Sequence, residues 1–211
     1  MGFTWPLYQI LLSQKMKIHS LLNLPQLPSA LLDHITASII GAPMQKVSGR
    51  KIVQLDGSTA DDAVYNRWPL SQEYTEYVNE LIPELSNSNF NIGFQSIANS
   101  SGQLCQLHPH TDGAVRGPFC IAFLISTGGM DVETIWWQQH EQDLLRSPWS
   151  HVWDLASLDK VDSVVFPEGR WNIMRTDLIH SVQNIDTNRV AFTIGFFDED
   201  LFDLIQEKYA L

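Results

Sequence analysis

The second half of the chain consists of short apolar segments that are separated by turn residues. Candidate strands lie at 90–98, 103–110, 119–126, 133–138, 163–166, 171–175, 180–184 and 189–197. Turn sequences such as Asn-Ser-Ser-Gly at 99–102 and Pro-Glu-Gly at 167–169 stand between them. Short strands at this spacing, without helices between them, favour a β-barrel or jelly roll over βαβ units.

Helical patterns dominate the segment before residue 88. Apolar residues recur at helical spacing in 30–40, and Gly41 ends that pattern. A second helix is expected to begin after Ser71, and Pro83 ends or bends it. Residues 51–55 are expected to form one strand between the two helices.

These patterns predict one domain that spans residues 1–211 and is mainly β with flanking helices. Its expected parts are mostly helical support in 1–88, a β-core in 90–198 and a C-terminal helix in 199–211. A chain of this length is long enough to enclose a full hydrophobic core.

The composition limits the classes of partner. The 211 residues are 44% hydrophobic and 18% charged, whereas a disordered chain would carry more charge and less apolar content. The net charge of −11 at pH 7 repels phosphate backbones and anionic lipid surfaces. We therefore expect neither nucleic acid nor a membrane as a partner, and the sequence alone leaves the oligomeric state open.

The cellular location is predicted from cysteine content and from the N-terminus. The two cysteines, Cys105 and Cys120, lack CxxC spacing and do not form a disulfide framework. No apolar run is long enough to cross a membrane, and the N-terminal lysines follow the first apolar stretch, which is the wrong order for a signal peptide. These features favour the reducing cytoplasm.

The sequence around His110 has the pattern of a metal site. Side chains two apart on a strand point the same way, so His110 and Asp112 are expected to bind one ion from one side. His180, which opens another expected strand, is the best candidate for a third ligand. Two histidines and one carboxylate leave positions open, as in non-haem iron(II) oxygenases. The alternatives are a hydrogen-bonded His110–Asp112 pair without metal, or His108 as the ligand.

Arg189 opens the last apolar strand, nine residues after His180 (189 − 180). An unpaired buried charge is costly, and the guanidinium fork binds a carboxylate through two parallel hydrogen bonds. Arg189 is therefore a candidate anion-binding residue. The alternative is a surface salt bridge with Asp186 or Glu199.

The order His110-x-Asp112, then His180, then Arg189 resembles the HxD…H…R motif of the 2-oxoglutarate- and iron(II)-dependent dioxygenases. The resemblance covers residues 90–197 in motif order and spacing. It implies a double-stranded β-helix core, the cupin-like jelly roll, in which His110, Asp112 and His180 are the catalytic metal ligands for Fe(II). It also implies O2 and 2-oxoglutarate as reactants.

The resemblance assigns the distal carboxylate of 2-oxoglutarate to Arg189. In the family a hydroxyl residue often stands two positions after the arginine, where this chain has Ala191. Thr193, on the same face one pleat further, is the expected substitute. Gln95 is a further candidate contact to the cosubstrate, with an outward-facing glutamine as the alternative.

The expected substrate contacts are Arg116, in the loop after Asp112, and Trp136 among the dense tryptophans. A solvated arginine and a packed indole are the alternatives. Residues 139–160 look like an insertion between core strands and are either a lid or a surface loop.

The leading functional hypothesis is a hydroxylase that acts on a small molecule or an amino acid. A peptide or protein side-chain hydroxylase is a close variant. The other classes are a cupin-like metal enzyme that does not use 2-oxoglutarate, which would carry more histidines, and a non-enzymatic binding protein, which an intact ligand set disfavours.

Overall fold

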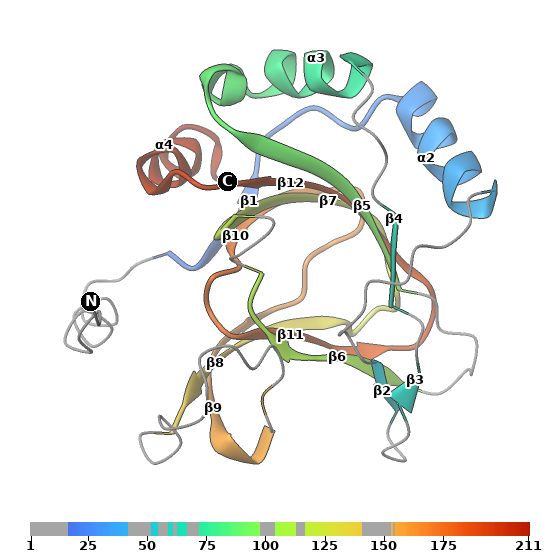
Figure 1. Cartoon of the computed structure of the whole chain (residues 1–211), viewed down its shortest axis with the longest axis vertical. Coiled ribbons are helices and arrows are strands. Elements are labelled where there is room, and N and C mark those ends of the chain that lie inside the picture. Colours follow the sequence, from blue (N-terminus) through green and yellow to red (C-terminus); the bar gives the residue numbers. More distant parts are fainter. Residues whose placement is uncertain are drawn as a thin grey trace.

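The computed structural model describes residues 17–41, 52–54, 59–60, 63–66, 72–97, 104–112, 117–140, 153 and 155–211. Two antiparallel sheets face each other, and helices cover the outer face of one of them (Figure 1). Among the described residues, no helix has the length and apolar character that crossing a bilayer requires.

Each sheet has six strands. Sheet A contains, in spatial order, β1 (His19–Leu22), β10 (Trp171–Arg175), β7 (Phe119–Thr127), β12 (Arg189–Phe196), β5 (Phe90–Ile97) and β4 (Ala63–Asn66). Sheet B contains β3 (Thr59–Ala60), β2 (Ile52–Gln54), β6 (Cys105–His110), β11 (His180–Ile185), β8 (Glu133–Gln139) and β9 (Leu158–Val164).

The pairing of the last eight strands, β5 to β12, defines a jelly roll. β5 pairs with β12, β6 with β11 and β8 with β9, while β7 and β10 also pair, so the strand ribbon folds back on itself. Consecutive strands from β5 to β8 alternate between sheets A and B. This is the double-stranded β-helix, and the predicted fold class is confirmed.

Helices α2 (Ser29–Gly41), α3 (Gln72–Leu81) and α4 (Glu199–Tyr209) lie over the outer face of sheet A (Figure 1). α3 ends before Pro83, as predicted, and a 3₁₀ helix, η1 (Pro83–Asn87), follows it. α4 begins at an Asp198 cap, whose carboxylate accepts a hydrogen bond from Leu201 N at 3.1 Å.

The segment before residue 88 is less helical than expected, because it also supplies β1 to β4. β1 and β4 lie at the two edges of sheet A. β9 spans 158–164 instead of 163–166. β1 and β4 were missed, and β9 was predicted with other bounds, because edge strands have one neighbour and carry polar residues. The apolar alternation that reveals a central strand is therefore weak in them.

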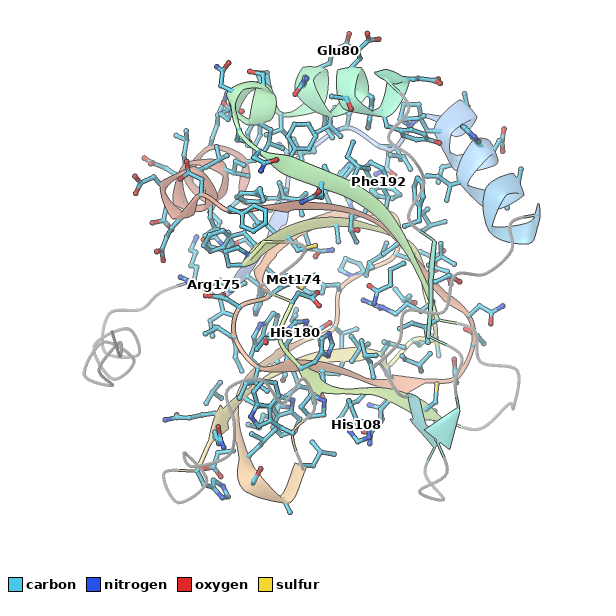
Figure 2. All side chains as sticks on the ribbon, in the orientation of Figure 1. Glu80, His108, Met174, Arg175, His180 and Phe192 are labelled. Carbon is cyan, nitrogen blue, oxygen red and sulfur yellow. The ribbon has the colours of Figure 1, made fainter. Side chains whose placement is uncertain are left out.

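β12 separates two environments in the centre of sheet A. Phe192, Ile194 and Phe196 point toward the helices and belong to the largest apolar cluster. The alternate side chains, from Arg189 to Gly195, point into the space between the sheets. In Figure 2, Phe192 lies on the helix side of the sheet and His180 lies between the two sheets.

Phe192→Ala should lower the free energy of unfolding by about 3–5 kcal/mol, the usual cost of truncating a buried phenylalanine. The side chain is wholly buried, and its ring lies 5.4 Å from Phe94 and 5.9 Å from Trp171, centroid to centroid. Denaturant unfolding measures the change. Glu80→Ala on the exposed face of α3 is the control and should stay within about 0.5 kcal/mol of wild type. A similar loss in both variants would contradict the packing role.

Candidate metal centre and its cavity

A bulge in β6 turns His110 toward the interior. His180 pairs with His110, but Val182 pairs with Leu107, so β6 has one more residue than β11 over this interval. As a result Leu107 and His110 both line the cavity between the sheets, although they are three residues apart. Pro109 falls in this bulge, where its missing N–H is tolerated.

The same bulge excludes His108 from the candidate metal cluster. Regular alternation had placed His108 and His110 on one face, but His108 lies on the outer side of sheet B (Figure 2). The alternative that His108 is the ligand is therefore wrong, and its cause is the extra residue between Leu107 and His110.

The two inward histidines are oriented in the same way. His110 Nδ1 lies 2.7 Å from the carbonyl oxygen of His108, and His180 Nδ1 lies 3.0 Å from the carbonyl oxygen of Leu178. A proton donated by Nδ1 to a carbonyl leaves the Nε2 lone pair for an ion. Backbone contacts thus select the metal-binding tautomer of both rings.

Asp112 lies just beyond the end of β6. Its position is held by a backbone hydrogen bond to a loop residue rather than by strand pairing. Asp112 N donates to the Thr176 carbonyl at 2.8 Å, and Thr176 N donates to the Pro118 carbonyl at 2.8 Å. Asp112 Oδ1 lies 3.7 Å from His110 Nε2. Asp112 therefore faces His110, as predicted, although it is not on the strand itself.

One potential ligand atom from each of His110, Asp112 and His180 lies within 4.8 Å of the other two. The rings of the two histidines are 4.4 Å apart, centroid to centroid, and both side chains are buried. Two oriented imidazoles and one carboxylate in a buried cluster form a donor set that fits a divalent transition metal. Of the described residues, only this cluster has such an arrangement.

Arg189 lines the same cavity and is 5% exposed. Its Nη1 donates to the Thr127 carbonyl at 2.9 Å, while its buried Nε has no partner in the described part of the chain. Burial lowers the pKa of Arg189 to about 10, which leaves the side chain charged at neutral pH. A buried cation without a carboxylate partner among the described residues creates a site for an anion.

The alternative for Arg189, a surface salt bridge with Asp186 or Glu199, is not found among the described residues. Glu199 instead pairs with Arg175, whose Nη1 lies 2.7 Å from the Glu199 carboxylate. Asp186 is exposed at the turn before β12. Arg189 opens its strand with its side chain directed inward, so the alternative is wrong on the ground of burial.

Thr193 and Gln95 also line this cavity, as expected. Thr193 faces Gly93 across the sheet and donates its hydroxyl to the Gly93 carbonyl at 3.1 Å. Ala191 faces Gln95 in the next row, so the carboxamide stands beside the position that lacks a hydroxyl. Gln95 is therefore an inward-facing glutamine rather than a solvated one.

Of the two expected substrate contacts, Trp136 does not line the cavity and Arg116 lies outside the described residues. Trp136 is wholly buried in a cluster with Leu124 and Ala191, and its Nε1 donates to the Arg175 carbonyl at 2.9 Å. The ring packs beside the cavity instead of lining it. Arg116 and most of the 139–160 segment lie outside the described residues.

Sequence reasoning missed several residues of the cavity wall. Cys120 lies in an apolar run of the sequence and was not predicted as a site residue, yet it lines the cavity, and so does its cross-strand partner Met174. Figure 2 shows Met174 between the two sheets. The missed signal was alternation in β7, where Cys120, Ala122 and Leu124 point inward and Phe119, Ile121 and Phe123 point toward the helices.

No protein-family model and no curated protein matches this chain. Among solved structures it is similar to SnoN, a non-heme alpha-ketoglutarate-dependent epimerase of nogalamycin biosynthesis, at 14% identity over 85% of this chain and 77% of that chain, with a TM-score of 0.49. It is also similar to a Pseudomonas putida prolyl-4-hydroxylase, at 11% identity over 81% of this chain and 85% of that chain, with a TM-score of 0.44. A 2OG-Fe(II) oxygenase family oxidoreductase of Burkholderia pseudomallei is similar at 12% identity over 90% of this chain and 89% of that chain, with a TM-score of 0.43.

His180→Ala should abolish stoichiometric binding of Fe(II), because two remaining ligands cannot hold the ion with the same affinity. Metal content after anaerobic loading and desalting measures the effect, with circular dichroism as the test of folding. His108→Ala is the matched control: it removes an imidazole two residues from His110 on the outer face of sheet B and should leave one iron per chain. Full occupancy in His180→Ala would contradict the assignment.

Proposed function

We propose that the protein is a 2-oxoglutarate- and Fe(II)-dependent oxygenase that hydroxylates a small molecule or an amino acid. The observation that carries the proposal is the presence, in one cavity, of the His110–Asp112–His180 cluster and the buried cation of Arg189. A metal site alone fits many enzymes, but a metal site with a desolvated carboxylate receptor fits a ligand that carries a chelating group at one end and a carboxylate at the other. 2-Oxoglutarate is such a ligand.

Each group has a separate role in this proposal. His110, Asp112 and His180 would hold Fe(II), which when bound supplies the activation of O2 that is coupled to decarboxylation of 2-oxoglutarate. Arg189 binds the distal carboxylate, and the wall around Leu124 and Ala191 keeps water away from that ion pair. Gln95 and Thr193 line the cavity on the same face as Arg189.

The expected outcome is hydroxylation. Substrate C–H, O2 and 2-oxoglutarate would give substrate C–OH, succinate and CO2, which balances all atoms. Asp112 supports this outcome, because halogenating relatives lack the carboxylate ligand and thereby leave room for a halide. A small molecule or an amino acid is the proposed substrate class, and a peptide or protein side chain is the close variant.

A cupin-like metal enzyme without 2-oxoglutarate is the second candidate. The same three-ligand cluster supports it, but such an enzyme gives no reason for a buried arginine without a carboxylate partner in the described residues. Dependence of turnover on 2-oxoglutarate separates the two candidates.

Arg189→Ala should raise the dissociation constant of 2-oxoglutarate by more than tenfold, because loss of one member of a buried charge pair typically costs about 2–5 kcal/mol. Anaerobic titration of the Fe(II)-loaded protein, followed by the visible charge-transfer absorption of a chelated 2-oxo acid, measures it. Iron content should not change. Arg170→Ala, which removes an exposed arginine just before β10, is the charge-matched control. An unchanged titration in Arg189→Ala would refute the carboxylate role.

The activity itself is tested by succinate release with Fe(II), 2-oxoglutarate and ascorbate against a panel of free amino acids and common metabolites. One succinate per product is expected, with a product heavier by one oxygen atom that derives from labelled O2. His180→Ala and Arg189→Ala should both be inactive for different reasons, one without iron and one without cosubstrate. Product formation in the absence of 2-oxoglutarate would favour the cupin-like candidate instead.

A further inference from the structure

Two turns meet directly behind Arg189. Gly128 lies between β7 and β8, and its carbonyl accepts hydrogen bonds from Asp186 N at 2.9 Å and Thr187 N at 3.0 Å, in the turn between β11 and β12. We call residues 126–129 and 186–189 the turn clasp. The clasp joins the turn that follows β7 to the turn that leads into β12. Because Arg189 is the first residue of β12, these hydrogen bonds help to fix its backbone.

Gly128 approaches Arg189 more closely than another residue could. Its φ of +84° lies in the left-handed region, and a Cβ at this position would lie 2.9 Å from Arg189 Cβ and 3.1 Å from Ile185 Cγ2. Arg189 Cβ is the root of its side chain, so it cannot swing away as a flexible end could. Any side chain at Gly128 therefore displaces the base of Arg189.

The same turn also holds the other end of that side chain. The carbonyl of Thr127, which precedes Gly128, accepts the hydrogen bond from Arg189 Nη1 at 2.9 Å. Thr127 Oγ1 donates to the Gly129 carbonyl at 2.7 Å, and this bond fixes the turn locally. One turn thus contacts Arg189 at both its Cβ and its guanidinium.

We propose that Gly128 is a positioning residue for the anion site: its lack of a side chain sets the Cβ of Arg189, and its turn sets the guanidinium, so that the charged fork faces the cavity. The inference rests on the proposed function for the identity of the anion, the distal carboxylate of 2-oxoglutarate. It does not rest on it for the position of Arg189, which can be measured without a ligand.

Gly128→Ala should raise the dissociation constant of 2-oxoglutarate by at least about tenfold in the anaerobic titration, since small displacements of a binding group cost large factors. Iron binding should stay at one per chain. Gly169→Ala controls for backbone strain, because Gly169 has the same kind of positive φ (+68°), lies outside the turn clasp, and would meet only Gln26 Oε1 at an ordinary contact distance of 3.7 Å. This variant should bind 2-oxoglutarate within about twofold of wild type.

A double-mutant cycle separates positioning from general damage. In the Arg189→Ala background, Gly128→Ala should cause no further loss of 2-oxoglutarate affinity, because the group through which it acts is gone. Additive losses, or an equal loss in Gly169→Ala, would overturn the inference. So would wild-type affinity in Gly128→Ala, and that result would leave the proposed function intact.

A ligand-independent measurement makes the two failures distinguishable. The Nε–H resonance of Arg189, assigned by its loss in Arg189→Ala, should shift or broaden in Gly128→Ala and stay unchanged in Gly169→Ala. Ser126→Ala is a milder variant that removes only the 2.9 Å hydrogen bond from Ser126 Oγ to the Asn188 carbonyl across the clasp, and it should perturb the same resonance. If the wild-type protein does not bind 2-oxoglutarate but the Arg189 Nε–H resonance shifts or broadens in the clasp variants, the proposed function fails and the positioning role stands. An unaltered resonance in both clasp variants overturns the positioning role.

Discussion

The strict alternation of side chains along β12 is the constraint on which the site depends. β12 lies in the centre of sheet A and pairs with β5 on one side and β7 on the other. Its outward phenylalanines are fixed by the helices, so its inward set from Arg189 to Gly195 has no freedom to exchange faces. A shift of one residue would bury Arg189 among phenylalanine rings and fill the cavity with aromatic side chains. One register thus sets both the core packing and the lining of the cavity.

Where the alternation is broken, the break places a functional group. The extra residue in β6 turns His110 inward and His108 outward. A second irregularity lies between Val182 and Ile185 in β11, where Asn184 adopts a φ of +62°. β11 keeps His180, Val182 and Ile185 on the buried side despite this change of spacing. Bulges next to a metal cluster direct side chains that a regular strand would misplace.

The sequence predicted the eight core strands, with other bounds for β9, because central strands carry apolar alternation. It also predicted which three residues would form the candidate metal-binding cluster, because metal-ligating side chains carry distinctive chemistry. It did not predict the bulge at Pro109, because only the proline itself signals a bulge in the sequence. This bulge determines that His110 rather than His108 faces the cavity. It assigned Trp136 to the substrate because indoles line pockets as well as cores, and only the packing with Leu124 and Ala191 separates these roles. Cys120 was missed because the apolar run of β7 hides the alternation that directs Cys120, Ala122 and Leu124 inward, and Met174 lies opposite Cys120 on the neighbouring strand.

The candidate metal-binding cluster and Arg189 belong to different sheets, so their separation depends on the contacts that join the sheets. His110 and His180 lie on sheet B, whereas Arg189 lies on sheet A. Trp136 of sheet B donates its Nε1 hydrogen bond to the Arg175 carbonyl of sheet A, and its ring stacks on His19 of β1 at 4.9 Å. His19 Nε2 in turn lies 3.3 Å from the Asp162 carboxylate of β9. Burial is the largest influence on His19 and lowers its pKa, although Asp162 acts in the opposite direction. This edge of the jelly roll is therefore closed by a packed indole and a short polar contact. The placement of the His110–Asp112–His180 cluster relative to Arg189 therefore depends on packing between the two sheets as well as on the register within each sheet.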